Sequence, residues 1–132
     1  MSLLEKAIAR SPDDAEVVFA LAKSYDAVGA WISAQDHYKR AIELNRGNLG
    51  YRLALAERYY ANDLTFQAIS MWREIVLLRP SLVDIRLKLA AAYLRLEQFP
   101  DALREYERVL QLDPKNSRAR EGIMRLRGRL SG

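Results

Sequence analysis

The chain has 132 residues, of which half are hydrophobic and 29% are charged, a balance that is typical of a folded domain and argues against disorder. It contains no cysteine, which excludes disulfides and thiolate chemistry, and no uncharged run approaches the roughly 20 residues that a membrane-spanning helix needs. The net charge is +4, but residues 115–132, with six basic residues against one acid, carry +5 and the rest of the chain −1.

The first predicted element is a helix within residues 1–14. It carries Glu5 and Lys6 where a signal peptide would need an apolar core, so nothing here directs export and we expect a cytoplasmic location by default. When this helix is aligned with the segments that follow, Ala7 matches Ala41, which makes it the second half of a helical hairpin. Either this helix caps the array or the chain is a fragment of a longer array that begins with a half-repeat, and we expect the fragment.

Residues 15–48 are predicted to form two helices. Asp13 and Asp14 can cap the first, because a short acidic side chain accepts hydrogen bonds from the free N–H groups at a helix start. Gly29 supplies the backbone freedom that a tight turn needs, and the second helix follows it.

The same residue types then return at a fixed period through residues 49–82 and 83–116. Leucine, alanine and tyrosine at i, i+1 and i+4 belong to one stripe of a helix, and an alanine and an aromatic residue at i and i+4 follow in the next helix. Alanine lets two helix backbones approach, and the aromatic ring fills the space beside it. One hairpin cannot cover its own apolar face, so each must stack on the next. The recurring residues are Leu21, Ala22, Tyr25, Ala34 and Tyr38, then Leu55, Ala56, Tyr59, Ala68 and Trp72, then Leu89, Ala90, Tyr93, Ala102 and Tyr106.

At these residues the chain resembles the tetratricopeptide repeat (TPR) family, whose helical-hairpin repeat has the same period, about 34 residues. The resemblance implies an all-α fold, a right-handed α-solenoid of antiparallel helix hairpins with about eight helices. The expected organisation is a single domain with a half-repeat helix at 1–14, repeats at 15–48, 49–82 and 83–116, and a C-terminal capping helix at 117–132.

The predicted capping helix follows Pro114. Asn116 or Ser117 can cap its start. Four apolar residues at i, i+4, i+7 and i+11 predict the face that it buries. These residues are Ala119, Ile123, Leu126 and Leu130.

The sequence offers no convincing active site or metal site. His37 is the only histidine and has no cluster of ligating residues beside it, so we expect a solvated surface residue. No glycine-rich phosphate motif occurs, and the carboxylates along the predicted helices form no pair that the sequence places together. Trp31 and Trp72 stand at positions that other repeats fill with aromatic residues, which favours core packing over ligand binding. We predict that this chain is not an enzyme and uses neither a cofactor nor a metal.

The resemblance also implies where a partner would bind. TPR proteins typically hold a peptide or a partner helix in a concave groove that the first helix of each repeat lines. Here the groove should be apolar along its middle and basic at its C-terminal end, so we expect a protein or peptide with apolar side chains followed by acidic ones. The simpler interpretation is that Phe19 and the leucines pack between repeats and the arginines form a solvated cap. The predicted groove residues are Phe19, Lys23, Leu53, Glu57, Tyr60, Leu87, Lys88, Leu94, Arg95, Arg118, Arg125 and Arg129.

Some TPR domains grip the C-terminal carboxylate of chaperones through a set of Lys, Asn and Arg side chains. Of the residues at the corresponding positions, only Lys88 keeps the basic character of its place, so chaperone binding is not expected. These residues are Phe19, Lys23, Ala54, Asp84 and Lys88.

Two other functions are compatible with the sequence. The basic cluster at 115–129 could attract nucleic acid or another anionic surface. Its footprint is small, however, and no aromatic residue interleaves the arginines for base stacking, so nucleic acid is not the expected partner. The N-terminal half-repeat could instead expose an apolar face that a second copy of the chain covers, giving a homo-oligomer.

Overall fold

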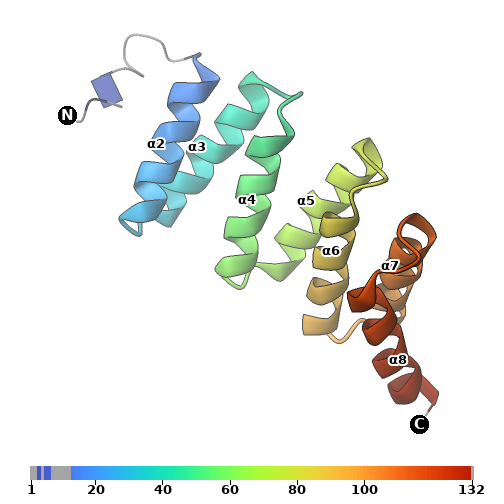
Figure 1. Ribbon diagram of the computed structural model, residues 1–132. Coiled ribbons are helices and arrows are strands. Elements are labelled where there is room, and N and C mark those ends of the chain that lie inside the picture. Colours follow the sequence, from blue (N-terminus) through green and yellow to red (C-terminus); the bar gives the residue numbers. More distant parts are fainter. Residues whose placement is uncertain (1–2, 4, 7–12, 132) are drawn as a thin grey trace. The chain divides into compact units, whose positions relative to one another are not determined.

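The computed structural model describes residues 3, 5–6 and 13–131 (Figure 1). This part of the chain contains helices joined by short turns and no strand, so the predicted all-α fold of helix hairpins is confirmed. Leu3, Glu5 and Lys6 are also helical, whereas Ala7, which set the register of the predicted half-repeat, lies outside the described residues. The seven helices with complete bounds are α2 (Ala15–Ala27), α3 (Trp31–Leu44), α4 (Leu49–Ala61), α5 (Thr65–Leu78), α6 (Val83–Arg95), α7 (Phe99–Leu112) and α8 (Ser117–Ser131).

The chain divides into two compact units, residues 1–55 and 56–132, and the division falls inside α4. Helix α2 packs against α3 in the first unit. In the second, α5 packs against α6, α6 against α7, and α7 against α8. The single domain and the repeat boundaries that the sequence suggests stay predictions.

The first unit begins with the predicted cap. The Asp14 side chain accepts hydrogen bonds from the backbone N–H groups of Glu16 at 3.0 Å and Val17 at 3.3 Å, which satisfies two donors at the start of α2. Both helices contribute small and large apolar side chains to the core of this unit. The buried residues of α2 and α3 are Val18, Leu21, Ala22, Ala34, Tyr38 and Ala41.

Three turns share one backbone geometry although their residues differ. Gly29 has φ of 79°, Asp63 of 60° and Glu97 of 58°, and the three occupy the same position in successive repeats. In each turn the next residue donates its N–H to the carbonyl of the repeat tyrosine five residues earlier. This is the hydrogen bond of a Schellman motif that spans the most residues. These hydrogen bonds run from Ala30 to Tyr25 at 2.9 Å, from Leu64 to Tyr59 at 2.8 Å and from Gln98 to Tyr93 at 2.9 Å.

In the second unit the predicted packing residues are buried. Trp72 is among the largest fully buried side chains, as predicted, and the Tyr60 ring centroid lies 5.3 Å from its own. An ion pair joins α6 to α7, with the Arg86 Nη1 atom 3.0 Å from Glu105 Oε1, and the two side chains are only 12% and 18% exposed. This pair fixes the two helices against each other through charge as well as apolar contact.

Helix α8 ends the second unit. The Asn116 side chain accepts from the backbone N–H of Ala119 at 3.0 Å, so the predicted cap is present. Three of the four apolar residues predicted for its inner face are buried, but Leu130 is 48% exposed and that prediction is wrong. The reason is that α7 begins at Phe99, and the Arg129 guanidinium of α8 already lies over the Phe99 ring. Helix α7 therefore has no further residue that could cover Leu130.

Candidate functional site

The predicted groove residues of the first unit lie on α2. Phe19 is half-buried, and its ring stacks on Tyr51 with centroids 4.5 Å apart and meets the edge of Tyr38 at 5.7 Å. Lys23 is exposed and places its Nζ atom 5.1 Å from the Phe19 ring centroid. Phe19 therefore packs against the core of its unit, which agrees with the simpler interpretation, and Lys23 covers its outer side. Leu53 of α4 is half-buried.

In the second unit the structure brings predicted residues of α4 and α6 together. Lys88 forms an ion pair with Glu57, and each side chain is roughly half exposed. The Arg95 guanidinium carbon lies 3.9 Å from the Tyr60 ring centroid, and its Nη1 atom is 3.3 Å from the Tyr60 carbonyl oxygen. The same nitrogen is 3.6 Å from Asp63 Oδ1.

Leu87 and Leu94 complete this surface. They stand two turns apart on α6 and therefore share one side of the helix, and both are half-buried. We call the surface made by Glu57, Tyr60, Asp63, Leu87, Lys88, Leu94 and Arg95 the α4–α6 face. The sequence predicts six of these seven residues, and Asp63 is the one that it does not predict.

The predicted arginines of α8 are all exposed. They stand at Arg118, Arg125 and Arg129, and the third holds its guanidinium carbon 5.0 Å from the Phe99 ring centroid. Burial raises the pKa of Tyr106 on α7, and the nearby Arg125 opposes that rise. Arg125 and Arg129 therefore lie near aromatic residues of α7.

The structure also describes the single histidine and the side chains that could hold a metal ion. His37 is half-buried and not fully solvated, since its Nδ1 atom lies 2.7 Å from the Ser33 carbonyl oxygen and its ring centroid 5.0 Å from that of Tyr25. Within the described ranges, no group of three or more His, Cys, Asp or Glu side chains is arranged to hold a metal ion. None of the helices described there is both long and apolar enough to pass through a bilayer.

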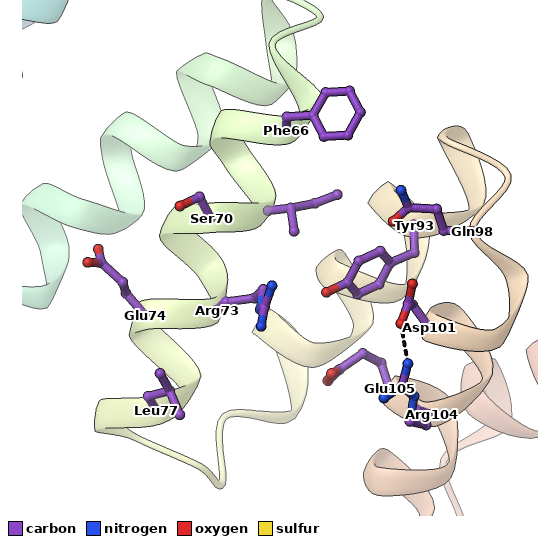
Figure 2. A pocket seen from close by; sticks show the side chains of 11 residues that line it. Phe66, Ser70, Arg73, Glu74, Leu77, Tyr93, Gln98, Asp101, Arg104 and Glu105 are labelled. Carbon is purple, nitrogen blue, oxygen red and sulfur yellow. Dashed lines mark hydrogen bonds and ion pairs between the residues drawn. The ribbon is translucent and has the colours of Figure 1, made fainter.

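Sequence analysis missed a cleft between α5 and α7. Its volume is about 660 Å³, and Tyr93 of α6 contributes to its lining (Figure 2). A signal for it was present in α5, where Phe66 and Leu77 are apolar but lie outside the recurring packing positions. The side chains that line the cleft are Phe66, Ile69, Ser70, Arg73, Glu74, Leu77, Tyr93, Gln98, Asp101, Arg104 and Glu105.

Comparison with known proteins identifies the repeat. Residues 83–116 match the family model described as tetratricopeptide repeat, and this is the range that the sequence predicts for the third repeat. Anaphase-promoting complex subunit 7 of Arabidopsis thaliana is 28% identical over 100 residues, which is 75% of this chain. The chain spans only 18% of the length of that relative.

Solved structures share the fold. A crystal structure of MamA superposes with a TM-score of 0.79 at 20% identity, covering 97% of this chain and 75% of that chain. The first TPR of Spaghetti (RPAP3), bound to the HSP90 peptide SRMEEVD, gives a TM-score of 0.70 at 24% identity, covering 89% of this chain and 94% of that chain. These similarities extend over nearly the whole chain and confirm the fold that the period predicts.

Proposed function

We propose that this chain, which belongs to the tetratricopeptide repeat family, is a non-catalytic scaffold that binds a segment of a partner protein along the first helix of each repeat. The observation that carries the proposal is the α4–α6 face. Side chains there come from two successive first helices, and they combine half-buried leucines, an aromatic ring and an arginine. Aromatic residues and arginine are the side chains that most often dominate binding energy at protein interfaces.

Contacts with Tyr60 and Asp63 hold the Arg95 side chain. Its guanidinium lies close enough to the Tyr60 ring for cation–π attraction, and the Tyr60 carbonyl and Asp63 hold its Nη1 atom from the side. An arginine fixed in this way loses less rotamer freedom when a partner binds, which favours affinity. Its remaining N–H groups can still donate to a partner carboxylate or carbonyl.

The partner that fits these residues carries apolar side chains and then acidic ones. Leu87 and Leu94 offer apolar contact on α6, while the charges of Lys88 and Glu57 compensate each other. Further along the chain, the exposed arginines of α8 would attract carboxylates. The first TPR of Spaghetti holds a peptide, and the relative from Arabidopsis is named as a subunit of a complex, so both are consistent with a scaffold.

The proposal can be tested with a random peptide library displayed on phage. Peptides enriched on the wild-type chain should contain apolar residues followed by Asp or Glu, and their affinity is measured by fluorescence anisotropy. The double variant Leu87→Ser with Arg95→Glu should weaken them at least about tenfold, which corresponds to about 1.4 kcal/mol.

The matched control is Arg108→Glu, which makes the same charge change on an exposed residue of α7. It should bind the peptides like wild type, and circular dichroism should show equal helicity for all variants. Enriched peptides that bind the double variant as tightly as wild type would remove the α4–α6 face from the proposal.

The two alternatives from the sequence remain predictions. Binding of nucleic acid or an anionic surface by α8 is tested by a salt series with duplex and single-stranded oligonucleotides, and no retention at about 50 mM salt would exclude it. Self-association is tested by sedimentation at several chain concentrations. A sedimentation coefficient that does not change would exclude the homo-oligomer.

A further inference from the structure

The cleft between α5 and α7 has an apolar rim that hairpin stacking does not require. Phe66 is 66% exposed and Leu77 is 81% exposed, and both lie on α5. The positions equivalent to Leu77 in the preceding and following repeats hold Glu43 and Gln111, so the repeat itself accepts polar residues there. Single exposed apolar side chains are common on protein surfaces, but these two border the same cleft, so a molecule that fills the cleft would cover both.

A largely buried tyrosine faces the cleft with its hydroxyl unpaired. Tyr93 is only 9% exposed, and its hydroxyl points toward the Arg73 guanidinium in Figure 2. No residue that the structure describes forms a hydrogen bond with this hydroxyl, and the oxygen is not among the buried polar atoms, so it reaches the open space of the cleft and is available to a ligand. A tyrosine hydroxyl keeps its proton at neutral pH, and burial raises the pKa of Tyr93 further, so this hydroxyl can donate a hydrogen bond to a ligand.

The charges around the cleft leave a cation beside this hydroxyl. On the α7 side, Asp101 pairs with Arg104 and Glu105 pairs with Arg86. Arg73 forms no ion pair with any described residue, and it is close enough to Tyr93 to oppose the rise in the pKa of that tyrosine. The other acid of the lining, Glu74, points away from Tyr93 in Figure 2. An anion between these two donors would therefore have the charge of Arg73 beside it. Asp101 and Glu105 also raise the pKa of Tyr93, but each is paired with another arginine.

We infer that this cleft is a second docking site, which binds an aspartate or glutamate side chain of a partner protein flanked by apolar residues. The partner carboxylate accepts hydrogen bonds from the Tyr93 hydroxyl and the Arg73 guanidinium. The apolar residues beside it cover Phe66 and Leu77. A cleft of about 660 Å³ has room for several side chains, and the carboxylate of the partner would form an ion pair with Arg73.

The site is separate from the proposed function. It shares no residue with the α4–α6 face, because its lining comes mainly from α5 and α7, which are the second helices of two repeats, and includes only Tyr93 from α6. Each site can therefore fail in an experiment while the other stands.

The test uses a panel of fluorescent peptides in which one glutamate is flanked on both sides by leucine or phenylalanine, together with the same peptides carrying glutamine instead. Glutamate peptides should bind at least about tenfold more tightly than their glutamine versions, because a hydrogen bond to a charged group is stronger. Amide NMR shifts on binding should be largest in α5 and α7.

Single variants then assign the effect. Tyr93→Phe and Arg73→Gln should each weaken the glutamate peptides about tenfold and leave the glutamine peptides unchanged. Tyr93→Phe removes only an oxygen without a partner in the described chain, so the melting temperature should not fall. Arg108→Gln, on the exposed side of α7 outside the cleft, is the matched control and should bind like wild type. Arg95→Glu should also leave binding in the cleft intact.

Three outcomes would overturn the inference. Glutamate and glutamine peptides could bind equally, or binding could survive both Tyr93→Phe and Arg73→Gln. Alternatively, NMR shifts in α5 and α7 could depend on the concentration of the chain alone, which would identify the occupant as a second copy.

Discussion

Gly122 is the point where α8 comes closest to α7, and replacing it with alanine tests the packing of these two helices. A Cβ atom at this position would lie 2.5 Å from the Cε2 and Cζ atoms of Tyr106 and 2.8 Å from Cδ2. Carbon atoms in normal contact are about 3.5–4.0 Å apart. Because the Tyr106 ring is nine-tenths buried, it has little space into which it could move.

Two effects of opposite sign determine the magnitude. Alanine is favoured over glycine inside a helix by about 1 kcal/mol. Overpacking a well-filled interior costs about 1–3 kcal/mol. Gly122→Ala should therefore lower the free energy of unfolding by up to about 2 kcal/mol. At Gly128 of the same helix nothing lies within 4 Å of an added Cβ, so Gly128→Ala should gain about 0.5–1 kcal/mol.

The assay is denaturant unfolding of wild type and both variants, followed by far-UV circular dichroism. Comparing the two variants cancels most of the helix preference, so their difference of about 1–3 kcal/mol reports the steric contact with Tyr106. Adding Tyr106→Leu to Gly122→Ala should recover part of the loss, because the smaller side chain vacates the position of the ring. If Gly122→Ala is as stable as Gly128→Ala, the close approach of α7 and α8 is refuted.

A turn, an ion pair and two tyrosines provide further tests. Glu97→Gly should raise the free energy of unfolding by up to about 1 kcal/mol, because Glu97 adopts φ of 58°, and a loss of stability in denaturant unfolding would contradict this. Glu105→Gln should lower the free energy of unfolding by about 2 kcal/mol, because Arg86 loses its carboxylate partner. This is less than the ~3–5 kcal/mol expected for fully buried pairs, since both side chains keep some exposure. An unchanged melting temperature would argue against the pair. Burial raises the pKa of Tyr93 and Tyr106, so both should ionise later than exposed tyrosines in a spectrophotometric titration. Their contribution to stability is complete below about pH 10 and should be lost above it, since the unfolded state gives up these protons first.

The fold could be predicted because the recurring residues are those that pack between helices. Leu89 and Ala90 are fully buried, and so is Ala102 on the following helix. Each of these positions tolerates only a narrow range of side-chain sizes, so the sequence repeats there. The period then determines the number of helices and the turns between them.

The surface could be predicted only in part. The sequence placed Glu57 and Lys88 in one groove, but their ion pair joins residues 31 positions apart on different helices and depends on how those helices pack. Phe19 remains a predicted groove residue, but spacing within its own helix could not reveal that its ring stacks on Tyr51 of another helix. The cleft between α5 and α7 requires three helices at once, so helical spacing within any one of them could not reveal it.

The turns show why departures from the period matter more than the period itself for function. Gly29, Asp63 and Glu97 all adopt a left-handed φ, so the hairpin is held by its hydrogen bond to the repeat tyrosine and not by glycine. Where hairpin stacking tolerates different residues at one position, the residue found there can be explained by binding and not by the fold. Lys88 and Arg95 stand where the two earlier repeats have alanine at both positions, so the fold requires neither charge. Since each forms contacts on the α4–α6 face, these are the residues at which loss of binding should separate most clearly from loss of stability.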